Sequence, residues 1–262
     1  MNSNELTDDH TKLCASVREA GELSLRYFRS KPRSWEKRPG DPVSEADIAI
    51  DELLRKRLYQ DEGCDGWLSE ESVDNSKRLA ARRVWIVDPI DGTRPFLLGR
   101  PEFAICAGLT IDGRPSLAAV FNPATGEFFD AVKGGGARCN GNAIRVSNCS
   151  KIEGSRISCN QETLSQYMSD QQLQTIKLIK LGSIAYRLAL VASGRHDACV
   201  SLHGKCDWDM AAAELLVTEA GGHVTIPDGE LIHYNCSTPY HPGVIAAGPQ
   251  LHESLVSTFR TL

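Results

Sequence analysis

The sequence predicts an α+β protein whose two halves join near residue 145. The first half combines two helical stripes of apolar side chains with a run of short strands, and the second half alternates helices and strands. With 262 residues, 41% hydrophobic and 24% charged, the chain can bury a large core. We therefore expect two closely packed units, residues 1–145 and residues 146–262, in an ordinary globular protein.

Two helices are expected at the start of the first half. Apolar side chains follow a helical stripe from Asp8 to Phe28. The next segment, Lys31 to Asp41, is rich in charge, Pro and Gly, and we expect a loop there that could act as a lid through Lys37. Ser44-x-x-Asp47 has the spacing of a capping box, so a second helix should begin there and continue through Leu58.

Strands are expected in the middle of the chain. Four short segments are rich in β-branched or aromatic residues, namely Arg83–Asp88, Phe103–Ile111, Ser116–Phe121 and Glu127–Val132. Turn residues separate the last three segments, which predicts an antiparallel meander.

The second half should contain helices from Ser183 to Gly194 and from Asp207 to Ala220. Strands are expected at residues 197–202, 223–226 and 244–247. Asp207 is expected to be the N-cap of its helix. That would leave Asp209, in the first turn, without a purely helical role.

Composition and charge exclude several classes of function. A formal net charge of −5 offers no general polyanion-binding surface, so a nucleic-acid polymer is not expected as a partner. The nine cysteines are odd in number and scattered, which is typical of reduced thiols in a cytoplasm. The N-terminus lacks the features of a signal peptide, and no apolar run approaches the ~18 residues of a membrane span. We expect a cytoplasmic protein that does not enter a membrane.

Several familiar sites are not expected. Gly134-Gly135-Gly136 lacks the Lys-Ser/Thr of a P-loop, and no G-x-S-x-G nucleophile motif is present. Five histidines are expected to be surface or structural residues rather than metal ligands, namely His10, His196, His223, His233 and His241.

The segment from Trp85 to Thr93 carries the strongest indication of function. An apolar strand stops at Asp88, and the following turn can bring Asp91 and the Ile90 carbonyl to the same side. Magnesium favours carboxylate and carbonyl oxygens, and phosphate oxygens complete its shell. Gly92 and Thr93 would offer backbone N–H groups and a hydroxyl to a phosphate. An ordinary Asp-Pro turn is the structural alternative, and this segment alone favours neither explanation.

Four further acids could complete such a site, although each has a structural explanation. Glu70-Glu71 could be exposed loop acids, yet the apolar pair Trp67-Leu68 suggests that the backbone there is anchored in the core. Asp209 could stabilise a helix dipole. Asp47 is explained by its capping box, or it could orient an attacking water together with Thr93.

Four ordered blocks of the chain resemble motifs of the inositol monophosphatase superfamily, whose members are magnesium-dependent, lithium-sensitive phosphomonoesterases. The blocks are Asp41-Pro42-Val43-Ser44-x-x-Asp47, Glu70-Glu71-Ser72, Trp85-x-x-Asp88-Pro89-Ile90-Asp91-Gly92-Thr93-x-x-Phe96, and Trp208-Asp209-x-Ala211-Ala212 through Glu219-Ala220-Gly221-Gly222. The resemblance implies an αβαβα layered sandwich, a homodimer and two or three bound Mg²⁺ ions.

The resemblance also implies roles for single residues. The metal ligands would be Glu70, Asp88, the Ile90 carbonyl, Asp91 and Asp209. Gly92 and Thr93 would hold the phosphate, and Asp47, Thr93 and the metal near Glu70 would position the nucleophilic water. Two magnesium ions would activate this water for an in-line displacement without a covalent intermediate. No implied ligand is lost, which disfavours a regulatory binding protein on the same fold, the non-enzymatic alternative.

The expected substrate is a small phosphorylated metabolite. In related inositol phosphatases a glutamate contacts the sugar at the position that Leu202 occupies here. Arg94, directly after Gly92-Thr93, is basic, as is common in 3'(2'),5'-bisphosphate nucleotidases and bacterial histidinol-phosphatases of this superfamily. His203 and Lys205 add positive charge, which a second anionic group on the substrate would use. Pro95 departs from the nucleotidase pattern. The favoured reaction is hydrolysis of 3'-phosphoadenosine 5'-phosphate to AMP, with histidinol phosphate and inositol 1-phosphate as alternatives.

Overall fold

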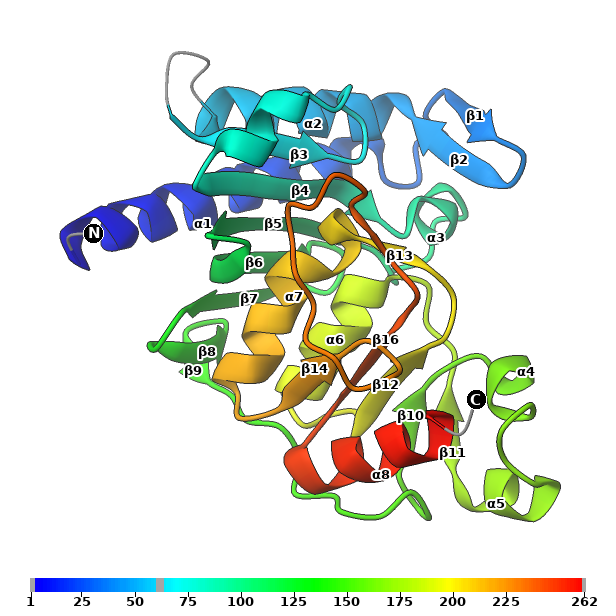
Figure 1. Ribbon diagram of the computed structural model, residues 1–262. Helices are drawn as coiled ribbons and strands as arrows, with labels where there is room; N and C mark the ends of the chain where they lie inside the picture. The colour runs from blue at the N-terminus through cyan, green and yellow to red at the C-terminus, as the bar shows by residue number, and fades with distance from the viewer. Residues whose placement is uncertain (1–2, 60–63, 261–262) are drawn as a thin grey trace.

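The computed structural model describes residues 3–59 and 64–260 and places them in alternating layers of helices and sheets (Figure 1). Helices α1 and α2 cover one face of a seven-stranded sheet, and α6 and α7 separate its other face from a five-stranded sheet. Helices α4, α5 and α8 cover the far side of that second sheet. The αβαβα sandwich implied by the resemblance is therefore confirmed. The helices are α1 Ser3–Tyr27, α2 Glu45–Leu58, α3 Thr93–Leu97, α4 Gln161–Leu164, α5 Asp170–Thr175, α6 Ile184–Ala192, α7 Asp207–Glu219, α8 Pro249–Phe259 and a short 3₁₀ helix, η1, Ser76–Ala80.

The seven-stranded sheet has the strand order β3-β4-β5-β6-β7-β8-β9. Strand β3 pairs with β4 in parallel, and the others form the expected antiparallel meander. Strand β4 continues beyond Asp88 to Asp91, because an irregularity between these two residues shifts the register without ending the strand. The strands are β3 Gly66–Ser69, β4 Arg83–Asp91, β5 Ala104–Ile111, β6 Arg114–Asn122, β7 Glu127–Val132, β8 Gly136–Cys139 and β9 Asn142–Ala143.

The five-stranded sheet has the order β11-β10-β12-β16-β14 and is mixed. Strands β11, β10 and β12 are parallel, whereas β16 runs antiparallel to both of its neighbours. The three strands expected in this half are confirmed as β12, β14 and β16, while β10 and β11 were not expected. Their bounds are β10 Arg156–Ser158, β11 Lys177–Ile179, β12 Ala198–Ser201, β14 His223–Thr225 and β16 Val244–Ala247.

Two small hairpin-like pairs complete the strands. Strands β1, Ser34–Arg38, and β2, Asp41–Ser44, pair antiparallel where the sequence predicted a loop, so that prediction was wrong. Every residue of β1 is exposed, so no apolar alternation marks it as a strand. Strands β13, Lys205–Cys206, and β15, Tyr240–His241, form the second pair.

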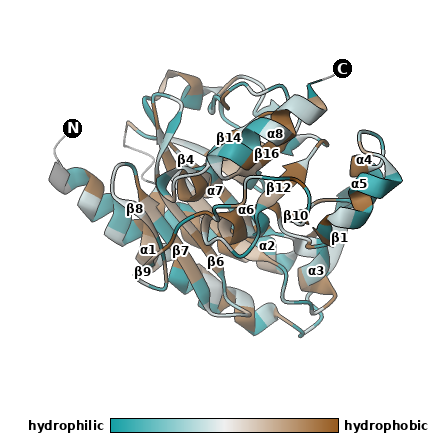
Figure 2. Cartoon of the chain, turned by 90° about the horizontal axis from the view of Figure 1, so that it is seen from below, coloured by the Kyte–Doolittle hydropathy of each residue, from teal (hydrophilic) through white to brown (hydrophobic). Residues whose placement is uncertain are grey.

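Three hydrophobic clusters lie between the layers. One fills the space between α1, α2 and the seven-stranded sheet, and another lies beneath α4, α5 and α8. The middle cluster joins Ile86 and Phe129 of the first sheet to Leu188 and Leu216 of α6 and α7. Figure 2 shows hydrophobic colour on the central strands and on α6, and mixed colour along α1 and α8. Residues on both sides of position 145 thus share one core, and the division into two units stays a prediction.

Across residues 3–59 and 64–260, no helix combines the length and the apolar character that crossing a membrane requires.

Candidate active site

A cavity of about 520 Å³ lies where β4 ends, between the β1–β2 hairpin and the start of α7. It collects nearly every residue that the sequence marked as functional, although these residues come from distant parts of the chain. Its lining is Gly40, Asp41, Pro42, Glu70, Asp88, Ile90, Asp91, Gly92, Thr93, Arg94, Pro95, Gly182, Lys205 and Asp209.

The irregular end of β4 places Asp88 and Asp91 in the cavity. Asp88 is 1% exposed, and its Oδ1 has no hydrogen-bond partner within the described structure. Asp91 is also buried, and its Oδ2 accepts hydrogen bonds from the Ser183 hydroxyl at 2.6 Å and the Ala185 N–H at 2.6 Å. Asp91 therefore joins β4 to the first turn of α6.

Gly92 allows the chain to turn sharply behind Asp91. Its φ of +98° lies in the left-handed region, and a Cβ there would meet the Glu102 carbonyl oxygen at 2.9 Å. Helix α3 then begins at Thr93, whose Oγ1 lies 3.0 Å from Asp47 Oδ1 and 3.1 Å from the Ile90 carbonyl oxygen. The structure thus provides the contact between Asp47 and Thr93 that sequence spacing alone could not establish.

Asp47 caps its helix and also contacts Thr93, the partner with which the sequence predicted it to orient a water. Its Oδ2 accepts hydrogen bonds from the Ser44 N–H at 2.8 Å and the Ser44 hydroxyl at 2.5 Å, which confirms the capping box of α2. Its Oδ1 accepts the bond from Thr93. Burial raises the pKa of the Asp47 carboxyl, while the hydrogen bonds from Ser44 and Thr93 oppose that rise.

The loop that carries Glu70 and Glu71 is fixed to α2 from both sides. Asp51 accepts hydrogen bonds from the hydroxyls of Ser69 and Ser72, each at 2.5 Å. Ser69, which replaces the glycine usual in this block of the resembled family, thus anchors the loop. The sequence did not indicate this role for Asp51, because an acid within a helix has many structural explanations.

Lys37 of the hairpin reaches into the same loop. Its Nζ donates to Glu70 Oε1 at 2.7 Å and to Glu71 Oε1 at 2.8 Å. Burial raises the pKa of Glu71 to about 7, and the ammonium of Lys37 opposes that rise. A cation bound at Glu70 would therefore share this carboxylate with Lys37 or displace the ammonium.

The start of α7 differs from the sequence prediction. The N-cap is Cys206, and Asp209 at the third helical position accepts the Cys206 N–H through Oδ2 at 2.8 Å. Asp207 lies instead in a buried network, where its carboxylate bonds His241 Nε2 at 2.7 Å and the Asn235 N–H at 2.8 Å. The prediction that Asp207 caps the helix was wrong, and Asp209 does have a helical role.

The cluster of acids has the chemistry of a cation site. Asp88, Asp91 and Asp209 each offer a carboxylate oxygen, and these atoms lie within 4.8 Å of one another. Burial raises the pKa of all three carboxyls, and repulsion from neighbouring acids adds to the rise at Asp88 and at Asp209, whose pKa reaches about 7. Oxygen donors and an unpartnered buried carboxylate atom fit a hard divalent cation such as Mg²⁺.

The basic residues expected on the substrate side are not equivalent. Arg94 lines the cavity and donates from Nη2 to the Gly40 carbonyl at 2.8 Å, which ties α3 to the hairpin. Lys205 also lines the cavity, and its Nζ contacts the Gly204 carbonyl at 3.0 Å. His203 is exposed and does not line the cavity.

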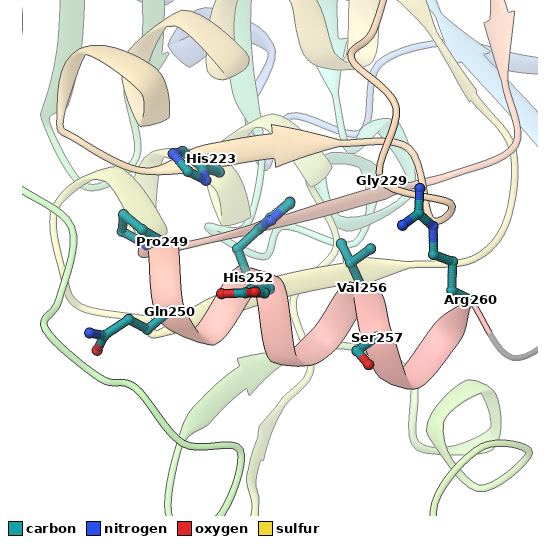
Figure 3. A pocket seen from close by; sticks show the side chains of 9 residues that line it. His223, Gly229, Pro249, Gln250, His252, Val256, Ser257 and Arg260 are labelled. Carbon is teal, nitrogen blue, oxygen red and sulfur yellow. The ribbon is translucent and has the colours of Figure 1, made fainter.

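A larger cavity, about 610 Å³, lies beside α8 and carries different chemistry (Figure 3). His223 and His252 lie near one end of it and Arg260 near the other. The pKa of His252 is lowered to about 4 by burial, and Thr225 lies within hydrogen-bonding distance at 3.0 Å. This histidine is a satisfied structural residue, and the carboxylate cluster lies in the other cavity.

Comparison with known proteins gives the same family along almost the whole chain. The model of the inositol monophosphatase family matches residues 6–262. The chain is 36% identical to an inositol-1-monophosphatase of Rhizobium meliloti, over 74% of this chain and 75% of that protein. It is 33% identical to a histidinol-phosphatase of Chlorobaculum parvum, over 83% and 85%. Among solved structures, the extragenic suppressor protein suhB of Bartonella henselae superposes with a TM-score of 0.84 at 28% identity, over 96% and 98%.

Proposed function

Because the chain belongs to the inositol monophosphatase family, whose members hydrolyse phosphoric monoesters in a metal-dependent reaction, we propose that the acid-lined cavity binds two or three Mg²⁺ ions and is its active site. The observation that supports this most directly is the cluster of three carboxylates, two of them buried, in which one Asp88 oxygen has no hydrogen-bond partner within the described residues. The proposed metal ligands are Glu70, Asp88, the Ile90 carbonyl, Asp91 and Asp209.

The chain's own residues would hold the two reactants in line. Gly92 and Thr93 would bind phosphate oxygens through backbone N–H groups at the start of α3. Thr93 donates its hydroxyl proton toward Asp47, so the oxygen's lone pairs are available to a water beside it. Asp47 and Thr93 would thereby orient the attacking water. Bound Mg²⁺ would lower the pKa of that water and neutralise negative charge on the phosphate.

For the substrate, we favour a metabolite with a second anionic group close to the scissile phosphate. Arg94 and Lys205 line the same cavity as the acids, so both cations could contact such a group. A 3'(2'),5'-bisphosphate nucleotide has this arrangement, and 3'-phosphoadenosine 5'-phosphate is the proposed substrate. His203 lies outside the cavity lining and is the weakest of the three residues proposed for this role.

Inositol 1-phosphate and histidinol phosphate are the competing substrates, favoured by the two relatives at 36% and 33% identity. Leu202 stands where a sugar-contacting glutamate is expected, which weighs against inositol phosphate. Histidinol carries positive charge, so Lys205 would repel it. Lithium sensitivity, a homodimer and a cytoplasmic location remain part of this proposal.

Phosphate release from the three substrates would test the proposal, in Mg²⁺, in EDTA and with added Li⁺. We expect turnover in Mg²⁺, its loss in EDTA and inhibition by Li⁺, with the bisphosphate nucleotide giving the highest kcat/KM. A preference for one of the other two substrates would replace the nucleotidase assignment. No release from any of the three in Mg²⁺ would instead support a binding protein on this fold.

A charge variant would test the substrate contact itself. Lys205→Gln should lower kcat/KM for the bisphosphate nucleotide by about tenfold or more, because a hydrogen bond to a charged group is lost. The same change should alter kcat/KM for inositol 1-phosphate by less than about threefold. Arg100→Gln, at an exposed residue outside the cavity lining, is the matched control. Equal losses on both substrates would contradict a role for Lys205 in selecting the second anion.

A further inference from the structure

A second group of potential metal ligands lies between α1 and β7. His10 and Cys14 belong to α1, and Asp130 belongs to β7 and faces the same side of the sheet as Phe128, which packs in the cluster beneath α1. None of the three lines the cavity that holds the acids. The phosphatase chemistry proposed above therefore makes no use of this group.

The spacing of the ligand atoms matches a tetrahedral ion. His10 Nε2 lies 3.4 Å from Cys14 Sγ and 3.3 Å from Asp130 Oδ2. Zinc bonds of about 2.0–2.3 Å at tetrahedral angles place neighbouring ligand atoms about 3.3–3.6 Å apart. The third pair, Cys14 and Asp130, lies within 4.8 Å, and a side-chain rotation would bring these two atoms to the tetrahedral spacing.

The donors also select the type of metal. A histidine and a cysteine four residues apart lie on one face of a helix, the spacing by which helical residues commonly share a zinc ion. Nitrogen and thiolate sulfur favour Zn²⁺ over Mg²⁺, whereas the active-site acids offer only oxygen. The sequence expectation that His10 is an ordinary histidine overlooked Cys14 at the fourth position after it.

Solvent and nearby charges around His10, Cys14 and Asp130 are compatible with a bound cation. The side chains of His10 and Asp130 are 19% and 12% exposed, so solvent reaches the group. Arg18 lies close by, with its guanidinium carbon 3.7 Å from the centre of the Phe128 ring, and it opposes a cation. One thiolate and one carboxylate outweigh this single charge, so the group is net negative once the thiol ionises.

We propose that His10, Cys14 and Asp130 bind a zinc ion, with a water molecule in the fourth position, and that this site pins α1 to β7. Burial and Asp130 raise the pKa of the Cys14 thiol to about 12, so the free group holds its proton. On binding, the S–H bond breaks, the proton passes to solvent and a zinc–sulfur bond forms. The site is independent of the phosphatase assignment.

Metal titration of the full-length protein would test the proposal. Excess Mg²⁺ would be present to occupy the oxygen-rich active site, and Zn²⁺ affinity would be measured by chelator competition. Titration with Co²⁺ would report a cobalt–thiolate charge-transfer band. We expect one zinc ion per chain beyond those held at the active site, a cobalt–thiolate band, and a rise in Tm with zinc.

The variants assign the band to one thiol. Cys14→Ser should abolish the band and weaken zinc affinity by about tenfold or more, and His10→Gln should weaken affinity similarly. Cys206→Ser is the matched control, because Cys206 adjoins Asp209 and is a cysteine through which the active site could mimic this signal. Circular dichroism would verify that each variant folds. A band that survives Cys14→Ser, or no zinc binding in excess Mg²⁺, would show a hydrogen-bonded group without a metal and overturn the proposal.

Discussion

Asp91 combines a structural and a proposed chemical role in one side chain. Its Oδ2 accepts hydrogen bonds from Ser183 and Ala185 at the start of α6, while a carboxylate oxygen contributes to the cluster with Asp88 and Asp209. An asparagine at this position can still accept hydrogen bonds through its amide oxygen, but it lacks the negative charge that a cation requires. The two roles can therefore be separated by one substitution.

We expect Asp91→Asn to reduce kcat/KM for phosphate release by about 100-fold or more, because the variant lacks a carboxylate proposed to hold the catalytic metal. Tm and the circular dichroism spectrum should change little, because the amide can keep a bond to α6. Steady-state kinetics with Mg²⁺ would measure the loss. Near-normal turnover by the folded variant would remove Asp91 from the proposed metal site.

Single residues also show how far sequence reasoning reached. Asp88, Asp91 and Gly92 stood out because they follow the end of an apolar strand. The other acids each had a structural explanation, so their expected roles came from the family resemblance. The helical role of Asp209 was missed, because acids are common both at the N-cap and at the third position of a helix. Only the structure shows that the N-cap is Cys206 and not Asp207. The hydrogen bond from Ser183 to Asp91 could not be predicted from the sequence, since 92 positions separate the two residues.

At the scale of elements, the turn between β4 and α3 depends on Gly92. We expect Gly92→Ala to lower the free energy of unfolding by about 1–3 kcal/mol, because the Cβ meets a backbone oxygen and the left-handed φ is strained. Gly126→Ala is the control, since its φ is +71° but a Cβ there meets nothing within 4 Å. Urea unfolding of both variants would measure the difference. Equal losses would mean that backbone conformation alone makes Gly92 necessary.

Helix α7 contains a buried acid whose charge opposes folding. Burial raises the pKa of Glu214 from 4.5 to about 7, and the Tyr234 hydroxyl bonds its Oε2 at 2.5 Å. Between these two pH values the unfolded chain has lost the proton that the folded chain keeps, so stability falls as pH rises through this window. Above about pH 7 the carboxyl is ionised in both states, so its destabilisation of the folded state no longer changes with pH.

Glu214→Gln should therefore stabilise the protein at pH 8 by about 1–3 kcal/mol relative to the unsubstituted chain. The difference should vanish near pH 4, where both chains are neutral at this position, and the amide oxygen can still accept the Tyr234 bond. Urea unfolding at the two pH values would give the comparison. Glu253→Gln, at an exposed position of α8, should show no such dependence.

Elements with strong periodicity were predicted well, and irregular ones were not. The meander from β5 to β7 and helices α1, α2, α6 and α7 follow from apolar spacing and turn residues. Strand β1 is exposed throughout and lacks apolar alternation, so its pairing with β2 has no signature in the sequence. Helix α8 does have a signal that was not used, since Pro249 at its first turn precedes Leu251, Leu255 and Phe259 at helical spacing.

At the scale of the whole molecule, the acid cluster destabilises the folded state on which it depends. The pKa of Asp88 is raised well above its ordinary value by burial and by Glu70, Asp91 and Asp209. The folded protein therefore loses stability as pH rises through the ordinary range of carboxyl groups. A divalent cation bound there would relieve the repulsion and raise the stability of the entire fold.

We expect Asp88→Asn to be more stable than the unsubstituted chain in EDTA by about 1–3 kcal/mol, and to be inactive. Excess Mg²⁺ should raise the Tm of the unsubstituted chain and have a much smaller effect on the variant. Thermal unfolding in both conditions would measure this reversal. Identical responses to Mg²⁺ would show that Asp88 contributes nothing to cation binding.

The distribution of the site over the sandwich has a consequence for how the protein matures. Asp47, Glu70, Asp88 and Asp91 leave the ribosome well before Asp209 and before Ser183, which holds Asp91 in place. Because their assembly depends on contacts of high sequence separation, we expect it to be slower than the formation of the local helices and hairpins. A nascent chain in which α6 and α7 have not yet packed between the two sheets has the first four acids but no formed pocket. Catalytic turnover is thus a property that only fully synthesised and packed molecules acquire.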